Sequence, residues 1–234
     1  MARSLSITWL GHATFILTSP GGKRIVTDPW LEGNPSCPES MKKIEQADLI
    51  LLSHGHFDHV GDAVTVARAT GATVVGIFEL CAWLEAKGVK NTSPMNIGGT
   101  QKIGDISVTM TMALHSSGTV EDGRPVYLGE PAGYVISFED GVRAYFAGDT
   151  ALFSDMRLIK DLYAPQIAFL PIGDHFTMGP DAAARACEML GVKQVVPMHW
   201  GTFPLLTGTP ERLKQLVEPL GLQVLALKPG QTAQ

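Results

Sequence analysis

Short apolar runs separated by turn residues dominate the first half of the chain. Runs rich in β-branched and aromatic residues are typical of β-strands, and they cover residues 4–10, 13–19, 23–28 and 47–53. The fourth run, ADLILLS, is continuously apolar, which is typical of a strand buried on both faces. The sequence PGG between the second and third runs predicts a hairpin turn.

From residue 61 onward the pattern changes to helices that alternate with strands. Residues 61–71 and 78–88 each predict a helix that ends at a glycine, the residue type favoured just past a helix C-terminus. Residues 72–77 predict a strand between these two helices. The middle of the chain is therefore predicted to be of the α/β type.

The second half repeats this arrangement. Strands are predicted over residues 105–115, 166–174 and 193–200, and a hairpin over 132–150, where Asp140 and Gly141 form the turn. A helix over 179–191 has Pro180 in its first turn and Gly191 after its end. A last helix over 209–221 has four apolar residues on one face: Leu213, Leu216, Val217 and Leu220.

Residues 116–133 contain glycine, proline and charged residues, and they predict a long loop. Loops of this length are uncommon and often bind ligands or act as lids, although a surface excursion without function is an equal alternative. The sequence has no interdomain linker, tandem repeat or low-complexity segment. We therefore expect one domain over residues 1–234.

Composition and charge narrow the class of protein. The chain is 45% hydrophobic and 18% charged, with a formal net charge of −5, as expected for an ordinary soluble domain. Binding to nucleic acid requires a basic surface, so the negative charge argues against that class of partner. A small-molecule substrate is the expected partner, and a homo-oligomer is compatible with the sequence.

The cysteines and the apolar segments bear on the compartment. Cys37, Cys81 and Cys187 are odd in number and far apart, which argues against a disulfide framework and favours a reducing compartment. The first residues contain no uninterrupted apolar stretch of the signal-peptide kind. No run of about 18 apolar residues predicts a membrane span. These features predict a cytoplasmic protein.

Histidines and an aspartate are concentrated directly after the apolar run 47–53. The chain has only seven histidines, yet the segment HGHFDH contains His54, His56 and His59 together with Asp58. Imidazole and carboxylate ligands without thiolate suit zinc, manganese, iron or nickel. A catalytic acid–base cluster and an accident of a polar loop are the alternatives.

Three further residues that can bind metal follow predicted strands. His115, Asp149 and His199 each come after an apolar run, where a side chain can project from the edge of a sheet. Taken singly, a histidine there is usually a loop residue and an aspartate a turn former. Their common position, in a chain that already contains the histidine cluster, favours metal ligands.

The order HGHFDH, His115, Asp149, His199 resembles the ligand order of the metallo-β-lactamase superfamily. The surrounding segments WLGHATFIL, TDPWL, FLPIGDHFTMGP and VVPMHWGTFP resemble the uncharacterised bacterial metal-dependent hydrolases. Those hydrolases are related to the ascorbate-6-phosphate lactonases and, more remotely, to the phospholipase D that cleaves N-acyl phosphatidylethanolamines. The resemblance implies a four-layer αβ/βα sandwich, in which two mixed β-sheets are flanked by helices and the active site lies at one edge.

The same resemblance implies two divalent metal ions, zinc first, with manganese, nickel or iron as alternatives. It assigns His54, His56 and His115 to the first ion, Asp58, His59 and His199 to the second, and Asp149 as a bridge between the two. True metallo-β-lactamases lack an aspartate at the bridging position, so β-lactam hydrolysis is disfavoured.

The expected function is a metal-dependent hydrolase of the lactonase or phosphodiesterase type. Two ions about 3.5–4 Å apart hold a hydroxide at neutral pH, and this hydroxide attacks an ester, lactone or phosphodiester. Asp58 is the expected catalytic residue, because it can orient or deprotonate the nucleophile as well as bind metal. An iron-dependent oxygen-utilising enzyme of the same fold and a non-catalytic metal- or ligand-binding protein are the alternatives.

Other polar residues near predicted strand ends have weaker claims. The resemblance places His12 and His175 near the pocket, where they could bind substrate, and a structural role is as plausible for both. Asp28 could orient a ligand histidine through its free ring N–H, or simply form a turn before Pro29. Trp200 and Phe203 could line the pocket or pack beside it.

Overall fold

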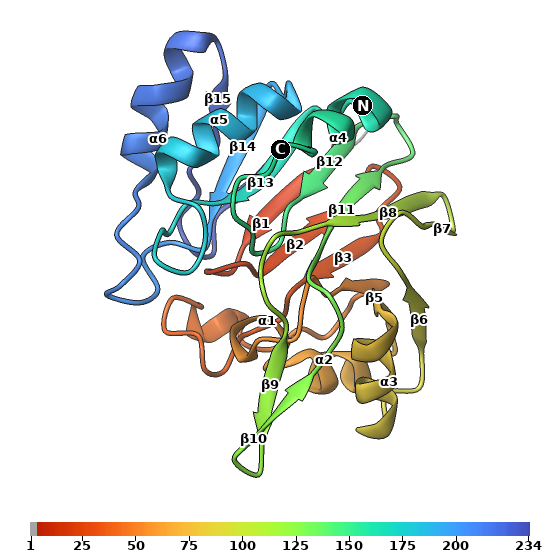
Figure 1. The fold of residues 1–234 in the computed structure, drawn as a ribbon. Helices are drawn as coiled ribbons and strands as arrows, with labels where there is room; N and C mark the ends of the chain where they lie inside the picture. Colours follow the sequence, from red (N-terminus) through yellow and green to blue (C-terminus); the bar gives the residue numbers. More distant parts are fainter. Residues whose placement is uncertain (1–3) are drawn as a thin grey trace.

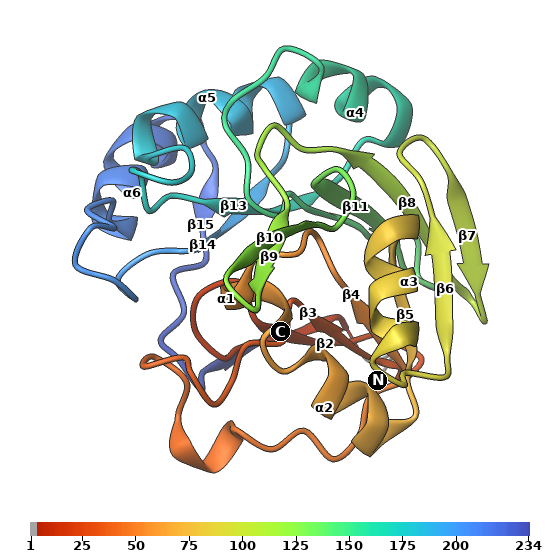
Figure 2. The same cartoon turned by 60° about the horizontal axis from the view of Figure 1, so that its bottom comes forward.

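Two seven-stranded β-sheets face each other, and helices lie on their outer faces (Figure 1). The computed structural model describes residues 4–234. The view in Figure 2 shows α2 (Ala63–Thr70) and α3 (Phe78–Ala86) beside the first sheet and α4 (Met156–Tyr163) and α5 (Pro180–Leu190) beside the second. This is the four-layer sandwich with two mixed sheets that the sequence predicts.

The first sheet has the strand order β16-β1-β2-β3-β4-β5-β6. Its strands are β1 (Ser6–Trp9), β2 (Phe15–Thr18), β3 (Arg24–Thr27), β4 (Leu49–Leu51), β5 (Thr73–Ile77), β6 (Thr92–Met95) and β16 (Thr232–Ala233). Strands β1, β2 and β3 pair in antiparallel fashion, and β3 to β6 pair in parallel. Two short helices, η1 (Glu39–Met41) and α1 (Phe57–Val60), lie in its connections.

The second sheet has the order β15-β14-β13-β12-β11-β8-β7. Its strands are β7 (Thr100–Ile103), β8 (Ile106–Met112), β11 (Ala132–Ser137), β12 (Arg143–Phe146), β13 (Ile167–Pro171), β14 (Gln194–Met198) and β15 (Gln223–Val224). Strands β12 to β15 are parallel, and α4, α5, α6 (Pro210–Val217) and the short η2 (Glu218–Leu220) lie in the connections between them.

The second sheet is buried on both faces because its side chains alternate between two cores. Along β13, Ala168 and Leu170 pack in the cluster that contains α4, α5 and α6, whereas Phe169 packs in the cluster shared with the first sheet. The ring of Phe169 meets that of Phe15 from β2 edge to face, with 4.9 Å between the ring centres. This contact joins the two sheets directly.

Segment 116–133 is not a loop throughout, and that expectation is wrong. It contains the antiparallel hairpin of β9 (Gly118–Glu121) and β10 (Arg124–Tyr127). Asp122 and Gly123 form the two-residue turn with φ of 49° and 72°. Positive φ at both central residues is what such a hairpin turn requires, and Asp-Gly is a favoured pair there.

The predicted apolar face of the last helix is wrong at its end. Leu213 and Val217 are fully buried, but Leu220 is 56% exposed. Pro219 cannot continue the hydrogen-bonding pattern of an α-helix, so α6 stops at Val217 and the next turn is a 3₁₀-helix with a different residue spacing. Helix α4 and the edge strands β6, β7, β15 and β16 were not predicted at all.

Strand direction determines which strand ends lie together at one edge of each sheet. Strands β1, β3 and β4 of the first sheet run in the same direction, as do β8, β12, β13 and β14 of the second. The carboxyl ends of each set therefore lie along a single edge of their sheet. Within residues 4–234, none of the helices has the length and apolar character needed to cross a bilayer.

Replacing Phe169 with Ala should lower the free energy of unfolding by about 3–5 kcal/mol, because the ring is fully buried between the sheets. The control Leu162→Ala, on a residue of α4 that is 68% exposed, should change it by less than about 0.5 kcal/mol. Urea denaturation followed by far-UV circular dichroism measures both. Equal losses in the two variants would contradict this packing.

Candidate metal centre

The sequence-predicted metal ligands meet where the carboxyl ends of the two sets of strands face each other. His54 and His56 follow β4, and α1 adds Asp58 and His59. The second sheet contributes the remaining three: His115 after β8, Asp149 after β12 and His199 after β14. Each sheet thus provides part of one compact cluster.

The first group consists of His54, His56 and His115, whose ligand atoms lie within 4.8 Å of one another. His54 Nε2 and His56 Nδ1 are 2.9 Å apart. Two nitrogen ligands of one tetrahedral zinc ion stand about 3.3 Å apart, given Zn–N distances of about 2.0–2.1 Å. The two nitrogens are therefore close to the separation that a shared ion requires.

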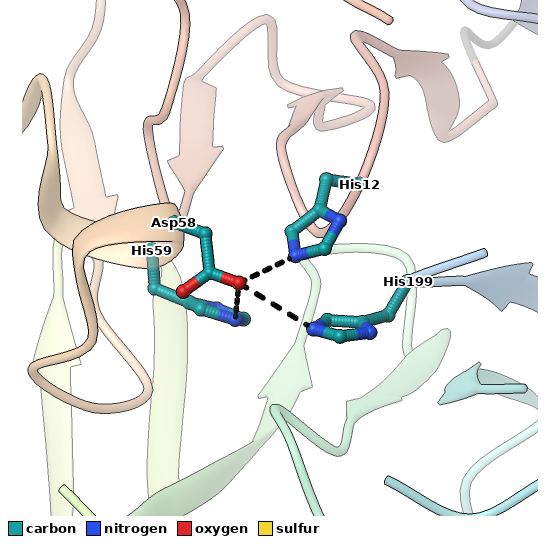
Figure 3. Close-up of side chains that lie close together, drawn as sticks. All are labelled: His12, Asp58, His59 and His199. Atoms are coloured by element: carbon teal, nitrogen blue, oxygen red, sulfur yellow. Dashed lines mark hydrogen bonds and ion pairs between the residues drawn. The ribbon is translucent and has the colours of Figure 1, made fainter. Parts of the chain in front are cut away.

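The second group consists of Asp58, His59 and His199, together with His12 (Figure 3). Asp58 Oδ2 lies 2.9 Å from His12 Nε2, 3.7 Å from His199 Nε2 and 4.0 Å from His59 Nε2. Three imidazoles from three different segments thus converge on one carboxylate oxygen.

Asp149 lies between the two groups. Its Oδ2 atom is 3.0 Å from His199 Nε2 and 3.3 Å from His59 Nε2 in the second group, and 3.7 Å from His115 Nε2 in the first. One carboxylate therefore faces ligands of both groups, which is the position a bridging residue needs.

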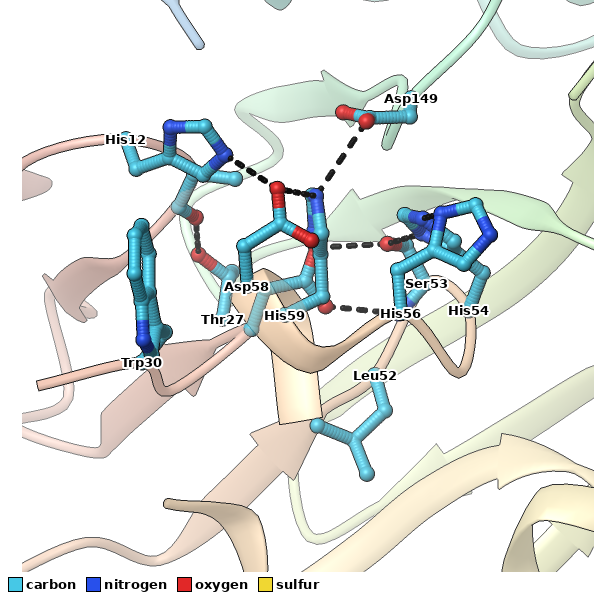
Figure 4. Close-up of polar contacts among 12 residues, drawn as sticks. His12, Thr27, Trp30, Leu52, Ser53, His54, His56, Asp58, His59 and Asp149 are labelled. Atoms are coloured by element: carbon cyan, nitrogen blue, oxygen red, sulfur yellow. Dashed lines mark hydrogen bonds and ion pairs between the residues drawn. The ribbon is translucent and has the colours of Figure 1, made fainter. Parts of the chain in front are cut away.

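A buried network behind the cluster holds two of the histidines in place (Figure 4). Asp28, which has no exposed surface, accepts hydrogen bonds from the backbone N–H of Ser53 at 2.7 Å, the Ser53 hydroxyl at 2.6 Å and His59 Nδ1 at 2.8 Å. Because the Ser53 hydroxyl donates to Asp28, its oxygen accepts from His54 Nδ1 at 2.9 Å. Both histidines then carry a proton on Nδ1 and turn Nε2 toward the cluster.

His12 differs from the other histidines of the second group in its hydrogen bonds. Its Nε2 donates to Asp58, and its Nδ1 lies 3.1 Å from the Thr202 hydroxyl. Burial, followed by the nearby His199, lowers the pKa of His12 to about 4, so the ring is neutral. His12 therefore fixes the orientation of Asp58 with both ring nitrogens occupied.

The buried charges of the cluster are strongly coupled. Burial alone raises the pKa of Asp149, but His199 and His59 outweigh it and hold that pKa well below its usual range. For His199, burial alone lowers the pKa. The Asp149 carboxylate outweighs this effect and raises the pKa of His199 to about 9. The Asp149 carboxylate is thus ionised and requires positive charge beside it.

The backbone is strained at three residues of the site. His12, Asp28 and His199 have φ of 56°, 39° and 55°. These values lie in the left-handed region, which residues other than glycine rarely adopt. His199 N–H donates to the His12 carbonyl at 3.0 Å, which couples two of these positions. Such strain is concentrated at functional sites, where the surrounding structure enforces it.

The unpaired atoms of the cluster fit divalent ions. Among residues 4–234, four buried cluster atoms have no hydrogen-bond partner: His59 Nε2, both ring nitrogens of His199, and Asp149 Oδ1. The 3.0 Å contact of His199 Nε2 with Asp149 lacks hydrogen-bond geometry. Leaving buried polar atoms unpaired is costly, and metal coordination would satisfy His59 Nε2, Asp149 Oδ1 and one ring nitrogen of His199 with a donor set of imidazole and carboxylate.

Several predicted residues lie outside this cluster. His175 is exposed in the loop after β13, and its ring packs against Phe176. Trp200 stacks on Trp9, 5.3 Å away, and belongs to the core, whereas Phe203 lines the cavity above the site. The structure also adds Ser53 and Thr202, which sequence reasoning missed. For Ser53 the available signal was a polar residue directly after a fully apolar strand.

Comparison with known proteins agrees with this geometry. The sequence pattern of the beta-lactamase superfamily domain matches residues 23–200. A UPF0173 metal-dependent hydrolase of Koribacter versatilis is 53% identical over 98% of both chains. Another, from Solibacter usitatus, is 52% identical over 98% of this chain and 100% of its own.

A solved structure supports the same relationship. Igni18, a metallo hydrolase from the hyperthermophilic archaeon Ignicoccus hospitalis, is 37% identical and has a TM-score of 0.86, with 98% of this chain and 97% of that chain covered. The chain therefore belongs to the beta-lactamase superfamily and, within it, to the family of the UPF0173 metal-dependent hydrolases. The resemblance found in the sequence is confirmed.

Replacing Ser53 with Ala should lower the free energy of unfolding by about 1–3 kcal/mol, because His54 Nδ1 loses its partner and Asp28 loses a donor, all out of water. Urea denaturation in EDTA measures this without any contribution from metal. Ser154→Ala, which removes an exposed hydroxyl bonded to Asp155, is the matched control and should have little effect. An equal loss of unfolding free energy in Ser53→Ala and Ser154→Ala would contradict these buried hydrogen bonds.

Proposed function

We propose that this protein is a metal-dependent hydrolase that uses two divalent ions to cleave an ester, a lactone or a phosphodiester. The observation that supports it most is the position of Asp149, whose Oδ2 atom lies within 3.7 Å of histidines from both ligand groups. The family's hydrolase name agrees with this chemistry.

The proposed ligand sets follow from the two groups. His54, His56 and His115 would hold one ion, Asp58, His59 and His199 the other, and Asp149 both; zinc suits this mixed donor set. When bound, such a pair supplies an activated water at neutral pH and stabilises negative charge on the substrate oxygen.

The protein's own groups then control the reaction geometry. Asp58 lines the cavity above the site, and His12 occupies its Oδ2 atom. Asp58 Oδ1 is left to orient the attacking water and to take its proton, which then passes to the leaving group. Thr202 holds His12, so the carboxylate keeps one orientation through the cycle. His12 is thus assigned to positioning Asp58 and not to substrate binding.

Replacing His56 or Asp149 with Ala should remove metal and hydrolytic activity together. His56→Ala deletes a ligand of one ion, whereas Asp149→Ala deletes the residue shared by both and should cost at least as much metal. His175→Ala, which removes an exposed histidine outside the cluster, should retain the metal content of the unaltered protein. Elemental analysis of protein purified without added metal measures all three.

Chelation should abolish turnover of a simple lactone and of bis(4-nitrophenyl) phosphate, and added zinc should restore it. The paired substrates report whether carbon or phosphorus is attacked. Full activity in metal-free Asp149→Ala protein would refute the proposal. Bound iron accompanied by oxygen consumption would instead indicate an oxygen-utilising enzyme.

A further inference from the structure

A cavity of about 560 Å³ opens above the metal-ligand cluster, and its floor and walls differ in chemistry. The floor consists of polar side chains from the cluster: His56, Asp58, His115, Asp149 and His199. The walls are apolar except for Ser116, and they consist of Phe57, Phe176, Phe203, Pro204 and Leu205. A molecule bound there places one polar group on the floor and apolar atoms against the walls.

The apolar walls come from three separate segments and are open to solvent. Phe57 begins α1 and is 62% exposed, Phe176 in the β13–α5 connection is 51% exposed, and Leu205 in the β14–α6 connection is 52% exposed. Exposed large apolar side chains that gather around one cavity are unfavourable in water and mark a site for an apolar ligand.

The apolar surface continues from this cavity toward the β9–β10 hairpin. A second hollow of about 680 Å³ shares His56, Phe57 and Ser116 with the first and is lined further by Val120, Pro125, Val126 and Tyr127 of the hairpin. Val120 is 70% exposed and Tyr127 62% exposed. Because the two hollows share three lining residues, they adjoin and form one groove that leads from the cluster to the hairpin.

Charge along the groove limits what can occupy it. Among the described residues that line the two hollows, none is Lys or Arg. A phosphate or carboxylate substituent placed in the groove would lose its hydration without gaining a positive partner, which is costly. The part of the substrate that extends away from the cluster is therefore uncharged.

We propose that the substrate is a carboxylic ester or lactone with an apolar acyl chain, whose carbonyl lies over the cluster while the chain follows the groove. This inference rests on the proposed hydrolase function. In the reaction, the water oxygen forms a bond to the acyl carbon and the bond from that carbon to the alcohol oxygen breaks. One water proton passes through Asp58 to the alcohol oxygen, giving an acid and an alcohol from an ester, or a single hydroxy acid from a lactone. Short chains fill the first hollow, and longer chains reach the hairpin.

The test uses the metal-loaded full-length protein and 4-nitrophenyl esters from acetyl to decanoyl. We expect kcat/KM to rise about two- to fourfold for each added methylene that becomes buried. Leu205→Ser should flatten this rise from the shortest chains onward. Val120→Ser should reduce kcat/KM only for the longest chains, because Val120 lines only the second hollow. Leu162→Ser, at an exposed site on α4 outside both hollows, should leave the whole series unchanged.

A second measurement does not depend on turnover. The neutral fluorescent probe N-phenyl-1-naphthylamine should bind metal-free protein, and Leu205→Ser should weaken this binding whereas Leu162→Ser should not. Turnover that is independent of chain length, or a preference for bis(4-nitrophenyl) phosphate over the decanoyl ester, would overturn the inference and leave the hydrolase function standing. Hydrolysis of none of these substrates by metal-loaded protein would instead overturn the proposed function, and this inference with it.

Discussion

Three carboxylates, Asp28, Asp58 and Asp149, lie almost entirely out of water at one edge of the sandwich, and their negative charge must be balanced there. Burial of uncompensated charge is too costly for a stable fold, so each carboxylate is surrounded by imidazole, hydroxyl or backbone N–H groups. Asp28 accepts hydrogen bonds from Ser53 and His59, and Asp58 accepts one from His12. Asp149 faces histidines of both groups. The ring orientations that suit a metal follow from this balance of charge.

The side chains of the cluster come together because strands of both sheets end at the same edge of the sandwich. A strand end places a side chain accurately, since the strand itself is fixed by its neighbours and by the core. Strain in the backbone of His12 and His199 is tolerated for the same reason: fully paired strands and buried rings on either side do not allow the chain to relax. The hairpin and the connecting loops, which are less constrained, supply the apolar walls above.

Much of this could be predicted from the sequence, and the failures have physical causes. The strands with continuous or alternating apolar runs were found because they depend on local patterns. The candidate ligands next to them were predicted from the same positions, and the structure brings their side chains together. Ser53 was missed because a hydroxyl in a network is recognised only by partners distant in sequence. The β9–β10 hairpin was missed because none of its strand residues is fully buried and the strands lack apolar alternation, although its Asp-Gly turn was visible. Helix α4 was not predicted although its sequence has a clear helical period, with Met156 and Ile159 on its buried face.

The division of the cluster between the sheets has a consequence for synthesis. Apart from its closing strand β16, the first sheet is built from residues 6–95, whereas His115, Asp149 and His199 belong to the second. A nascent chain that has emerged only as far as β6 already contains HGHFDH but holds an incomplete ligand set for either proposed ion. With the proposed ligand sets, both ions can therefore be held only after nearly the whole polypeptide has left the ribosome and the two sheets have packed together. On the same assignment, a translation product that ends before His199 would lack a ligand of the second proposed ion.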